Sequence, residues 1–462
     1  MEGDARMRIV VLNGSPKGPT SVTMQYVAFW QKLFSQHDFD IIHVAQTVNH
    51  LERDTVAWEK TVASIRAADL IVWAFPVYVL LVSAQYKRFI ELVFERAGDA
   101  LAGKPAVAVT TSIRFFDHTA HNYIQSVSED LGMHFHGGYS AAMDDLFKPE
   151  ERSRFEQFGR YVLNAATGKV PVSRVSQPMP KANNEYRPDE SVPQVECGGK
   201  RVAIVTDQAQ DSNLARMVSR FSDCLAGQVE VFHLGDIDIK GGCLGCIRCG
   251  YNNQCVYEGR DEFVDFHKKL KNFDILVFAG AIRDRYLSST WKTFYDRSFY
   301  NNHVPSFSGK QVAFLISGPL GSVPNLRQIL EAHAELQQAN LAGIVTDEAD
   351  SVEIDCKIQR LAAVCIRFSQ DGFVRPPSFL STGGRKIFRD EIWGKIGFPF
   401  VADYRYYQAH GLFDFPHNNY QTRIRSWLMR LAVTIPVVRR AVYSEKIREA
   451  MIAPYQNLLK KL

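Results

Sequence analysis

The sequence contains few of the features that build secreted or membrane-spanning chains. Its 462 residues include only eight cysteines, too few for a disulfide framework in a chain of this length. The longest apolar run, residues 70–84, has 15 residues and contains Pro76, whereas a membrane-spanning helix needs about 18 or more. The first seven residues, Met-Glu-Gly-Asp-Ala-Arg-Met, are partly acidic where a signal peptide is basic and then apolar. We therefore expect a cytoplasmic chain, and we interpret residues 70–84 as a buried strand that runs into a loop.

A strong excess of either charge sign is also missing, since the formal net charge is +4. The charge is unevenly distributed, because residues 423–462 carry nine Lys or Arg and two Glu, which leaves the rest of the chain at −3. This mildly acidic body, in which we recognise no nucleic-acid-binding module, argues against nucleic acid as a partner. With 46% hydrophobic and 23% charged residues the composition is globular, and the length predicts roughly three domain-sized units.

Two parts of the sequence resemble each other. Residues 8–14, Arg-Ile-Val-Val-Leu-Asn-Gly, resemble residues 201–207, Arg-Val-Ala-Ile-Val-Thr-Asp, at an offset of 193. Further along, Tyr86-Lys-Arg-Phe89 resembles Trp291-Lys-Thr-Phe294 at an offset of 205. The second copy has therefore gained about 12 residues between its first and third strands, which is where four cysteines lie.

Within each copy, short β-branched runs alternate with segments of helical periodicity, which predicts a parallel sheet covered on both faces. The expected strands are residues 8–12, 39–44, 69–75, 105–111 and 135–139 in the first copy, and 201–206, 228–234, 274–280, 310–317 and 341–346 in the second. Five parallel strands in about 160 residues fit a doubly wound α/β fold of the flavodoxin type. We expect two such domains at residues 1–167 and 200–369, joined by a proline-rich linker at 168–199.

The remaining residues, 370–462, belong to neither copy and predict a mostly helical extension. They are rich in aromatic residues up to Phe415, and from Trp427 onward apolar residues alternate with arginines until Pro436 breaks the pattern. A basic amphipathic segment of this kind can lie on an anionic membrane surface. The alternative is a helix that packs its apolar side on the body or on a second chain, so peripheral membrane contact and homo-oligomerisation both stay open.

A candidate anion site follows the first strand. Residues 13–21, Asn-Gly-Ser-Pro-Lys-Gly-Pro-Thr-Ser, form a glycine- and hydroxyl-rich turn, and helical periodicity begins at Val22. Backbone N–H groups, hydroxyls and the helix dipole converge at such a turn and favour a phosphate. The turn matches neither the phosphate loop of nucleotide hydrolases nor the dinucleotide fingerprint, which argues against both functions.

A second motif, Phe75-Pro-Val-Tyr78 followed by Tyr86-Lys-Arg-Phe89, comes after the third strand. Together with the Gly-Ser-Pro turn it resembles the NADPH-dependent FMN reductase family over residues 7–165. That family has a flavodoxin-like fold and a Pro-x-Tyr loop before a Lys-x-Phe helix. The resemblance implies that the FMN phosphate is held by Ser15, Lys17, Ser21 and Thr23. It also implies that the flavin ring is contacted by Pro76, Val77, Tyr78 and Val79 and bordered by Thr110, Thr111 and Ser112.

The second copy carries a compact cysteine block. Cys243, Cys246, Cys249 and Cys255 have a C-x2-C-x2-C-x5-C spacing, and four thiolates this close can hold one [4Fe–4S] cluster. The block resembles the cysteine motif of the iron–sulfur flavoproteins, relatives of the FMN reductases. A zinc site with four thiolates and a set of plain thiols are the alternatives. The isolated residues Cys197, Cys224, Cys356 and Cys365 are interpreted as linker or core thiols.

The flavin loops of the second copy depart from the family pattern. Its first loop has no glycine and carries Asp207 and Asp211, which would repel a phosphate. Its ring loop, residues 281–288, lacks the proline of the motif. Ser212, Ser317 and Gly318 could still support a flavin, but we expect the second copy to lack one.

The two copies are therefore complementary. In the iron–sulfur flavoproteins each cluster lies beside the FMN of a neighbouring subunit, which suggests a fused pseudo-dimer with FMN on the first copy facing a cluster on the second. We expect a flavin-dependent oxidoreductase or electron-transfer flavoprotein that exchanges electrons with NAD(P)H, a quinone or another small molecule, or a redox protein. Hydride transfer requires no acid–base pair, and we name no catalytic residue. The alternative is a non-catalytic scaffold or assembly protein that retains a degenerate flavodoxin-like fold.

Overall fold

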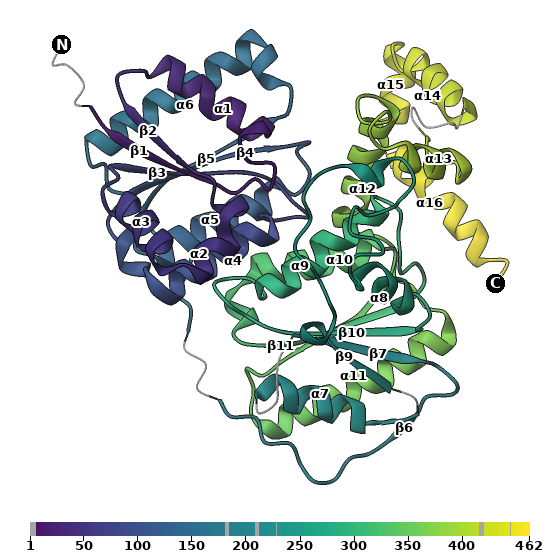
Figure 1. Ribbon diagram of the computed structural model, residues 1–462. Coiled ribbons are helices and arrows are strands. Elements are labelled where there is room, and N and C mark those ends of the chain that lie inside the picture. Colours follow the sequence, from purple (N-terminus) through teal and green to yellow (C-terminus); the bar gives the residue numbers. More distant parts are fainter. Residues whose placement is uncertain (1–5, 181–183, 208–211, 228, 415–419, 444) are drawn as a thin grey trace. The chain divides into compact units, whose positions relative to one another are not determined.

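The computed structural model describes residues 6–180, 184–207, 212–227, 229–414, 420–443 and 445–462. Two five-stranded sheets, each with all its strands parallel and with helices on both faces, form the body of the chain (Figure 1). The strand orders are β2-β1-β3-β4-β5 and β12-β11-β10-β7-β9. Both are the doubly wound order of the flavodoxin fold, so the predicted α/β fold class is confirmed.

The first sheet is built from near-continuous apolar runs. Its strands are β1 (Arg8–Asn13), β2 (Asp38–Ile42), β3 (Leu70–Pro76), β4 (Pro105–Ser112) and β5 (His134–Ala142). Its helices are α1 (Val22–Leu33), α2 (Val44–Arg53), α3 (Thr55–Arg66), α4 (Ala84–Arg96), α5 (Asp117–Asp130) and α6 (Pro149–Thr167), with 3-10 turns η1 (Gly18–Thr20), η2 (Gly98–Leu101) and η3 (Asp145–Phe147). Strands β1, β3 and β4 are buried along most of their length, as expected for a parallel sheet covered on both faces.

The second sheet repeats this plan. Its strands are β7 (Val202–Thr206), β9 (Val229–His233), β10 (Ile275–Ala281), β11 (Gln311–Ser317) and β12 (Asn340–Thr346). Its helices are α7 (Asn213–Asp223), α8 (Phe263–Leu270), α9 (Ser289–Ser298), α10 (Pro324–Leu336) and α11 (Ser351–Asp371), with 3-10 turns η4 (Leu234–Asp236), η5 (Arg248–Gly250), η6 (Phe299–Asn301) and η7 (Leu320–Ser322). Two short strands, β6 (Val195–Glu196) and β8 (Leu225–Ala226), pair beside it. The strand positions predicted from the sequence are confirmed to within one or two residues in most cases, the largest difference being three residues at the end of β5.

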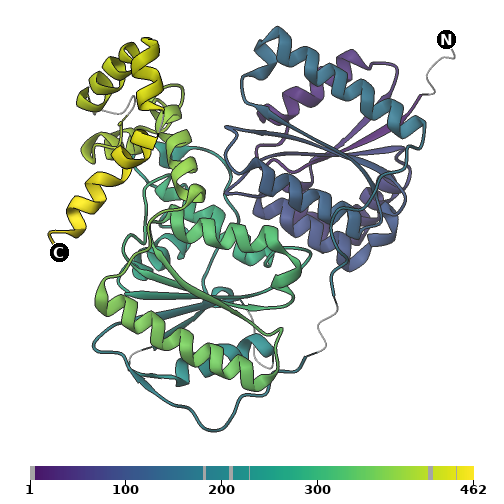
Figure 2. The same ribbon diagram turned by 180° about the vertical axis from the view of Figure 1, so that it is seen from behind.

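The helices divide into layers that explain how the two copies meet. Helices α1 and α6 cover one face of the first sheet and α2–α5 the other, while α7 and α11 cover one face of the second sheet and α8–α10 the other (Figures 1 and 2). A single apolar cluster runs from the α2–α5 side of the first copy into the α8–α10 side of the second. Helices α4 and α9 pack against each other at this junction. The two copies therefore share one continuous core.

The C-terminal residues form a helical extension with α12 (Phe379–Trp393), α13 (Val401–Ala409), α14 (Tyr420–Ala432), α15 (Pro436–Val442) and α16 (Glu445–Leu459). Pro436 is the first residue of α15, so the predicted break at this proline is confirmed. The chain divides into two compact units, residues 1–406 and 407–462. The domain boundaries at 167, 199 and 369 stay predictions. Among the described residues, no helix has the length and apolar character needed to cross a bilayer.

Candidate functional site

The loop after β1 is built around buried hydroxyls. Ser15 is fully buried, its backbone N–H donates to Asn13 Oδ1 at 3.0 Å, and its Oγ accepts from the Lys17 N–H at 3.3 Å. Ser21 caps α1 by accepting from the Met24 N–H at 3.3 Å. A Cβ on Gly14 would overlap the Tyr86 ring, so glycine is required there for the loop to pass α4. The predicted turn from strand to helix is therefore present at the carboxyl end of β1.

The loop after β3 makes a tight hairpin. Tyr78 and Leu81 exchange backbone hydrogen bonds of 2.7 and 2.9 Å, and the two residues between them, Val79 and Leu80, have φ of +35° and +69°. A turn with two positive φ angles normally contains Asn and Gly, so valine and leucine are strained here. Strain of this kind is concentrated at functional loops.

The third predicted loop follows β4. Thr110 Oγ1 lies 2.7 Å from His121 Nε2, and Thr111 Oγ1 lies 2.6 Å from Thr23 Oγ1, which joins this loop to the first turn of α1. Burial lowers the pKa of His121, so its imidazole is neutral at neutral pH. Ser112 Oγ accepts from the Arg114 N–H at 2.8 Å.

The three predicted loops meet at one edge of the first sheet. Strands β1, β3 and β4 are adjacent and in parallel register, with Asn13 opposite Ala74 and Pro76 opposite Thr111. The predicted phosphate residues, ring-loop residues and third-loop residues therefore gather at the carboxyl ends of neighbouring strands. This is where open α/β sheets bind their ligands. The arrangement offers hydroxyls and a helix N-terminus to a phosphate, and a strained hairpin to a planar ring.

In the second copy, carboxylates of the chain itself occupy the corresponding loops. Asp207 accepts a hydrogen bond from the Ser288 hydroxyl, and burial raises its pKa. Asp347 accepts from Ser317 Oγ at 2.6 Å and from the Gly318 N–H at 2.7 Å. These carboxylates use donors that a phosphate or flavin edge would need, and the absence of a flavin from this copy stays a prediction. Asp211, the other predicted repelling residue, lies outside the described residues.

The cysteine block is an irregular segment between β9 and α8. The Gly245 N–H donates to Cys243 Sγ at 3.4 Å, and Cys249 Sγ lies 3.5 Å from Asn302 Oδ1. Burial raises the pKa of Cys243 and that of Cys249 to about 12, helped at Cys249 by the charges of Cys246 and Cys255. Both thiols are therefore protonated at neutral pH unless a metal displaces the proton.

No metal centre is formed by these thiols as the structure has them. Among the described residues, which include all four cysteines of the block, no three Cys, His, Asp or Glu side chains form a group that could hold a metal ion. The iron–sulfur cluster and the zinc alternative are therefore not confirmed. The donor set itself still suits such a group, because four thiols lie within one short segment and at least one already receives a backbone N–H.

Arg297 of α9 anchors the cysteine block. Its buried guanidinium binds both carboxylate oxygens of Asp261, at 2.7 and 3.0 Å, and donates to the Gly241 carbonyl at 2.9 Å. It also lies 4.1 Å from the centre of the Tyr257 ring. The ends of the block are thus held by one cation with planar, two-point geometry.

The block lies directly against the ring loop of the first copy. Gln85 Nε2 donates to the Cys243 carbonyl at 3.1 Å, and a Cβ on Gly245 would overlap the Tyr78 hydroxyl. Burial raises the pKa of Tyr78, and the nearby Cys243 adds to the shift. The structure therefore brings together the two motifs that the sequence places in different copies.

A network of buried charges joins α4 and α9 with approximate two-fold symmetry. In α4, Lys87 binds Glu91 at 3.0 Å and Asp284 of the second ring loop at 2.7 Å. In α9, the equivalent Lys292 binds Asp296 and donates to the Tyr78 carbonyl of the first ring loop at 3.1 Å. Each ring loop is thus fixed by a lysine of the other copy.

The same network caps each helix with a carboxylate of the other copy. Glu91 accepts from the Ser289 N–H at 2.6 Å, and Asp296 accepts from the Ala84 N–H at 2.7 Å. Burial raises the pKa of Asp296 to about 6 against the opposing effect of Lys292, whereas at Glu91 burial is outweighed by Lys87 and by hydrogen bonds, so its pKa is lowered.

Sequence reasoning missed the residues that connect the two copies. No sequence motif contained Gln85, Asp296 or Arg297. The two lysines of the network, however, stand at equivalent positions, 87 and 292, in the two aligned segments. The spacing of an acidic residue four positions after each lysine was the signal that could have identified the network.

Comparisons with known proteins agree with this geometry. The family model described as NADPH-dependent FMN reductase matches twice, at residues 7–146 and 200–346. A search of curated proteins found no match.

Several solved structures are similar to part of the chain. An apo NADH:FMN oxidoreductase (EMOB) is 18% identical, with a TM-score of 0.30, over 34% of this chain and 89% of that chain. The NAD(P)H:(acceptor) oxidoreductase FerB from Paracoccus denitrificans is 17% identical, with a TM-score of 0.31, over 36% and 100%. An FMN-dependent NADH-azoreductase from Bacillus anthracis is 11% identical, with a TM-score of 0.26, over 35% and 99%. Because the family model covers more than half of the chain, in two copies, the chain belongs to the NADPH-dependent FMN reductase family of flavin-dependent oxidoreductases.

Proposed function

We propose that the first copy binds FMN and accepts reducing equivalents from NAD(P)H, while the second copy contributes the cysteine block as the electron-transfer partner of that flavin. The observation that carries this proposal is the contact between Tyr78 of the ring loop and Gly245 of the block. The flavin motif and the cysteine motif lie on separate copies, and their contact supports a joint role in electron transfer.

The residues of the first copy divide into two groups by what they can do. Ser15, Lys17, Ser21 and Thr23 surround the N-terminus of α1, where hydroxyls, an exposed ammonium group and the helix dipole suit a dianionic phosphate. Residues 76–79 form the strained hairpin against which the ring would lie, and residues 110–112 border it. FMN supplies the hydride chemistry when bound, so the chain has to bind, orient and shield it.

Lys292 has a positioning role in this proposal. It is fully buried and holds the Tyr78 carbonyl, so it fixes the hairpin on which the flavin ring depends. Asp296 balances its charge and simultaneously binds the first turn of α4. The proposed flavin loop of one copy is therefore held in place by a helix of the other.

For the cysteine block we propose a [4Fe–4S] cluster bound by Cys243, Cys246, Cys249 and Cys255. Support comes from the compact four-thiol spacing, from the N–H of Gly245 on Cys243 and from the anchoring by Arg297. Such a cluster would accept or donate single electrons, and its binding would require the thiols to converge and to lose their protons.

The test is cofactor content in matched variants of anaerobically purified protein. Wild type should carry FMN and iron together, and Tyr78→Ala should weaken FMN binding at least tenfold. Arg283→Ala is the control, because Arg283 has the same hairpin position in the second copy, where it exchanges backbone bonds with Tyr286. Equal FMN loss in both variants, or none in Tyr78→Ala and Ser15→Ala, would contradict the assignment to the first copy.

Two other results would revise the proposal. A protein that binds FMN but no iron would retain the flavin assignment and remove the cluster, with zinc content as the further measurement. A colourless protein that cannot be reconstituted with either cofactor would favour the scaffold alternative, for which the carboxylate-filled loops of the second copy are the specific observation.

For the C-terminal unit we propose contact with an anionic membrane surface. Helix α14 has no buried residue, and Ile424, Trp427 and Leu431 are each about half exposed or more beside Arg425 and Arg430. Exposed apolar and basic side chains on one short helix are the composition of an interfacial segment.

A further inference from the structure

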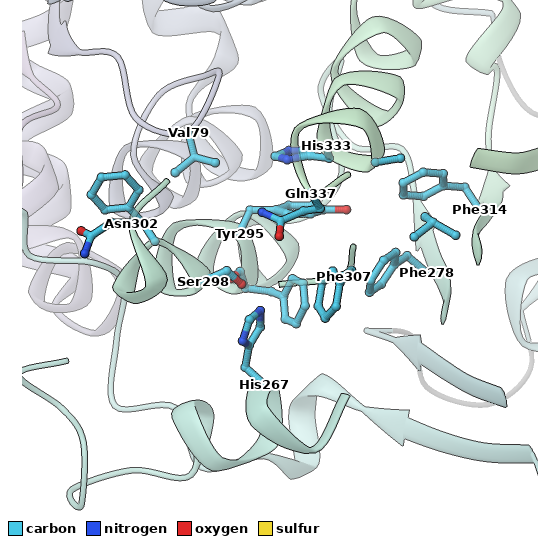
Figure 3. Close-up of a pocket in the computed structure, with 14 residues that line it drawn as sticks. Val79, His267, Phe278, Tyr295, Ser298, Asn302, Phe307, Phe314, His333 and Gln337 are labelled. Carbon is cyan, nitrogen blue, oxygen red and sulfur yellow. The ribbon is translucent and has the colours of Figure 1, made fainter. Parts of the chain in front are cut away.

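The second copy contains a cavity of about 90 Å³ beside the first ring loop. It lies between strands β10 and β11 and helices α8, α9 and α10, and Val79 of the first copy reaches one end of it (Figure 3). The lining is largely aromatic and includes Phe278, Phe307 and Phe314. This volume is several times the roughly 10–15 Å³ that one water molecule needs.

Two buried polar atoms at this cavity have no hydrogen-bond partner among the residues that the structure describes. They are the Tyr295 hydroxyl and His333 Nε2, on rings that stack with centres 3.8 Å apart. Leaving a buried polar group unpaired is unfavourable, so both atoms are sites at which a ligand would gain a hydrogen bond. Burial lowers the pKa of His333 to about 3, and the Lys292 charge contributes in the same direction. The imidazole is therefore neutral at neutral pH.

Comparison with the equivalent position in the first copy shows which polar group this cavity lacks. The residue equivalent to Val79 is Asp284, which reaches into the first copy and is bound there by Lys87 at 2.7 Å and by the Tyr123 hydroxyl at 3.1 Å. Val79 offers no polar atom, so the matching space in the second copy is left with an apolar end and two unpaired polar atoms. The first copy receives a hydrogen-bonded carboxylate at this position, whereas the second copy receives the apolar Val79 side chain beside the cavity.

We infer that this cavity is a binding site for a small, uncharged, single-ring aromatic compound that carries a carbonyl oxygen. The aromatic walls suit a planar ring, and the Tyr295 hydroxyl can donate to the carbonyl. A charged ligand is disfavoured, because the lining contains no Asp, Glu, Lys or Arg to pair with it and its histidines, His267 and His333, are both neutral. The site shares Val79 with the loops proposed to hold FMN, and binding to it does not require the proposed flavin chemistry.

Titration calorimetry of the full chain without NAD(P)H tests this inference, with acetophenone as the probe. Toluene lacks the carbonyl and benzoate adds a charge. We expect acetophenone to bind about fivefold or more tightly than toluene, the equivalent of a hydrogen bond of about 1 kcal/mol, and benzoate not to bind. Tyr295→Phe should remove the preference for acetophenone while leaving toluene binding unchanged.

A cavity-filling variant locates the site. Ala334 lines the cavity and is buried, so Ala334→Leu should abolish binding of both neutral probes while circular dichroism shows the fold retained. Should that variant fail to fold, Ser298→Leu fills the same space, since the Ser298 hydroxyl donates to the Phe294 carbonyl of its own helix. Absence of acetophenone binding to wild type, or undiminished binding to a folded cavity-filling variant, would overturn the inference.

Discussion

Gly245 is the residue at which the cysteine block approaches the first ring loop. Its φ is +63°, and a Cβ there would overlap the Tyr78 hydroxyl. Gly245→Ala should therefore displace Tyr78 and weaken FMN binding about tenfold or more. Gly259→Ala is the matched control, because Gly259 has a similar φ of +74° but no atom within 4 Å of an added Cβ. Fluorescence titration with FMN measures both, and equal weakening would assign the effect to backbone strain.

His333 makes a pH-dependent contribution to stability. Its folded pKa of about 3 lies below its ordinary value of about 6.5, so the unfolded chain binds more protons between these values. The free energy of unfolding should fall as the pH drops below 6.5, by up to about 1.4 kcal/mol per pH unit from this residue. Asp296, whose pKa of about 6 is raised by burial, acts in the opposite direction below pH 6.

The test compares variants by urea denaturation at pH 7, 6 and 5. His333→Gln should flatten the pH dependence relative to wild type, whereas His50→Gln, at an exposed position of α2, should follow wild type. If the free energy of unfolding of His333→Gln falls with pH as steeply as that of wild type, this imidazole does not govern the loss of stability.

At the scale of single residues, the sequence predicted the positions of the three loops after β1, β3 and β4 but not their connections to the second copy. Ser15 and Tyr78 could be found because strand, turn and helix signals surround them. Lys292 and Asp296 could not, because their function depends on a helix from the other copy, whose packing no local pattern encodes. The sequence predicted that Asp207 would repel a phosphate, whereas its partner, the Ser288 hydroxyl, is visible only in three dimensions.

At the scale of elements, α9 is the support of the cysteine block through Arg297. Arg297→Met would leave the Asp261 carboxylate buried and unpaired, which costs about 3–5 kcal/mol. The block should loosen, so Cys243 and Cys249 should react faster with Ellman's reagent. Arg248→Met, at an exposed arginine inside the block, is the control and should leave thiol reactivity unchanged. If Cys243 and Cys249 react with Ellman's reagent no faster in Arg297→Met than in wild type, the anchoring role is contradicted.

The strands were predicted well because parallel strands buried on both faces leave continuous apolar runs. Strands β3 and β10 are examples, with all but their last residue buried. The cysteine block was different, since it contains only the short turn η5 and its path is set by Arg297 and by contact with Gln85. The spacing of the cysteines predicted a shared ligand, whereas among the described residues these thiols do not form a group that could hold a metal ion.

At the scale of the whole molecule, the basic C-terminal unit gives a prediction about partners. The full chain should sediment with vesicles of phosphatidylcholine and phosphatidylglycerol at low salt, and much less with phosphatidylcholine alone or at high salt. A Trp427→Glu, Leu431→Glu variant should lose this binding. Sedimentation that is independent of lipid charge, or absent, would leave packing on a second chain as the interpretation, with the oligomeric state in solution as the measurement.

The core shared between α4 and α9 has a consequence for how the two copies associate. In a dimer of separate subunits the junction forms by collision and is lost on dilution, whereas here one chain supplies both sides. The effective concentration of one copy at the other is set by the length and stiffness of the connecting chain and does not change with protein concentration. The junction therefore contains two ring loops and one cysteine block in a fixed ratio, and each half is free to differ from its counterpart.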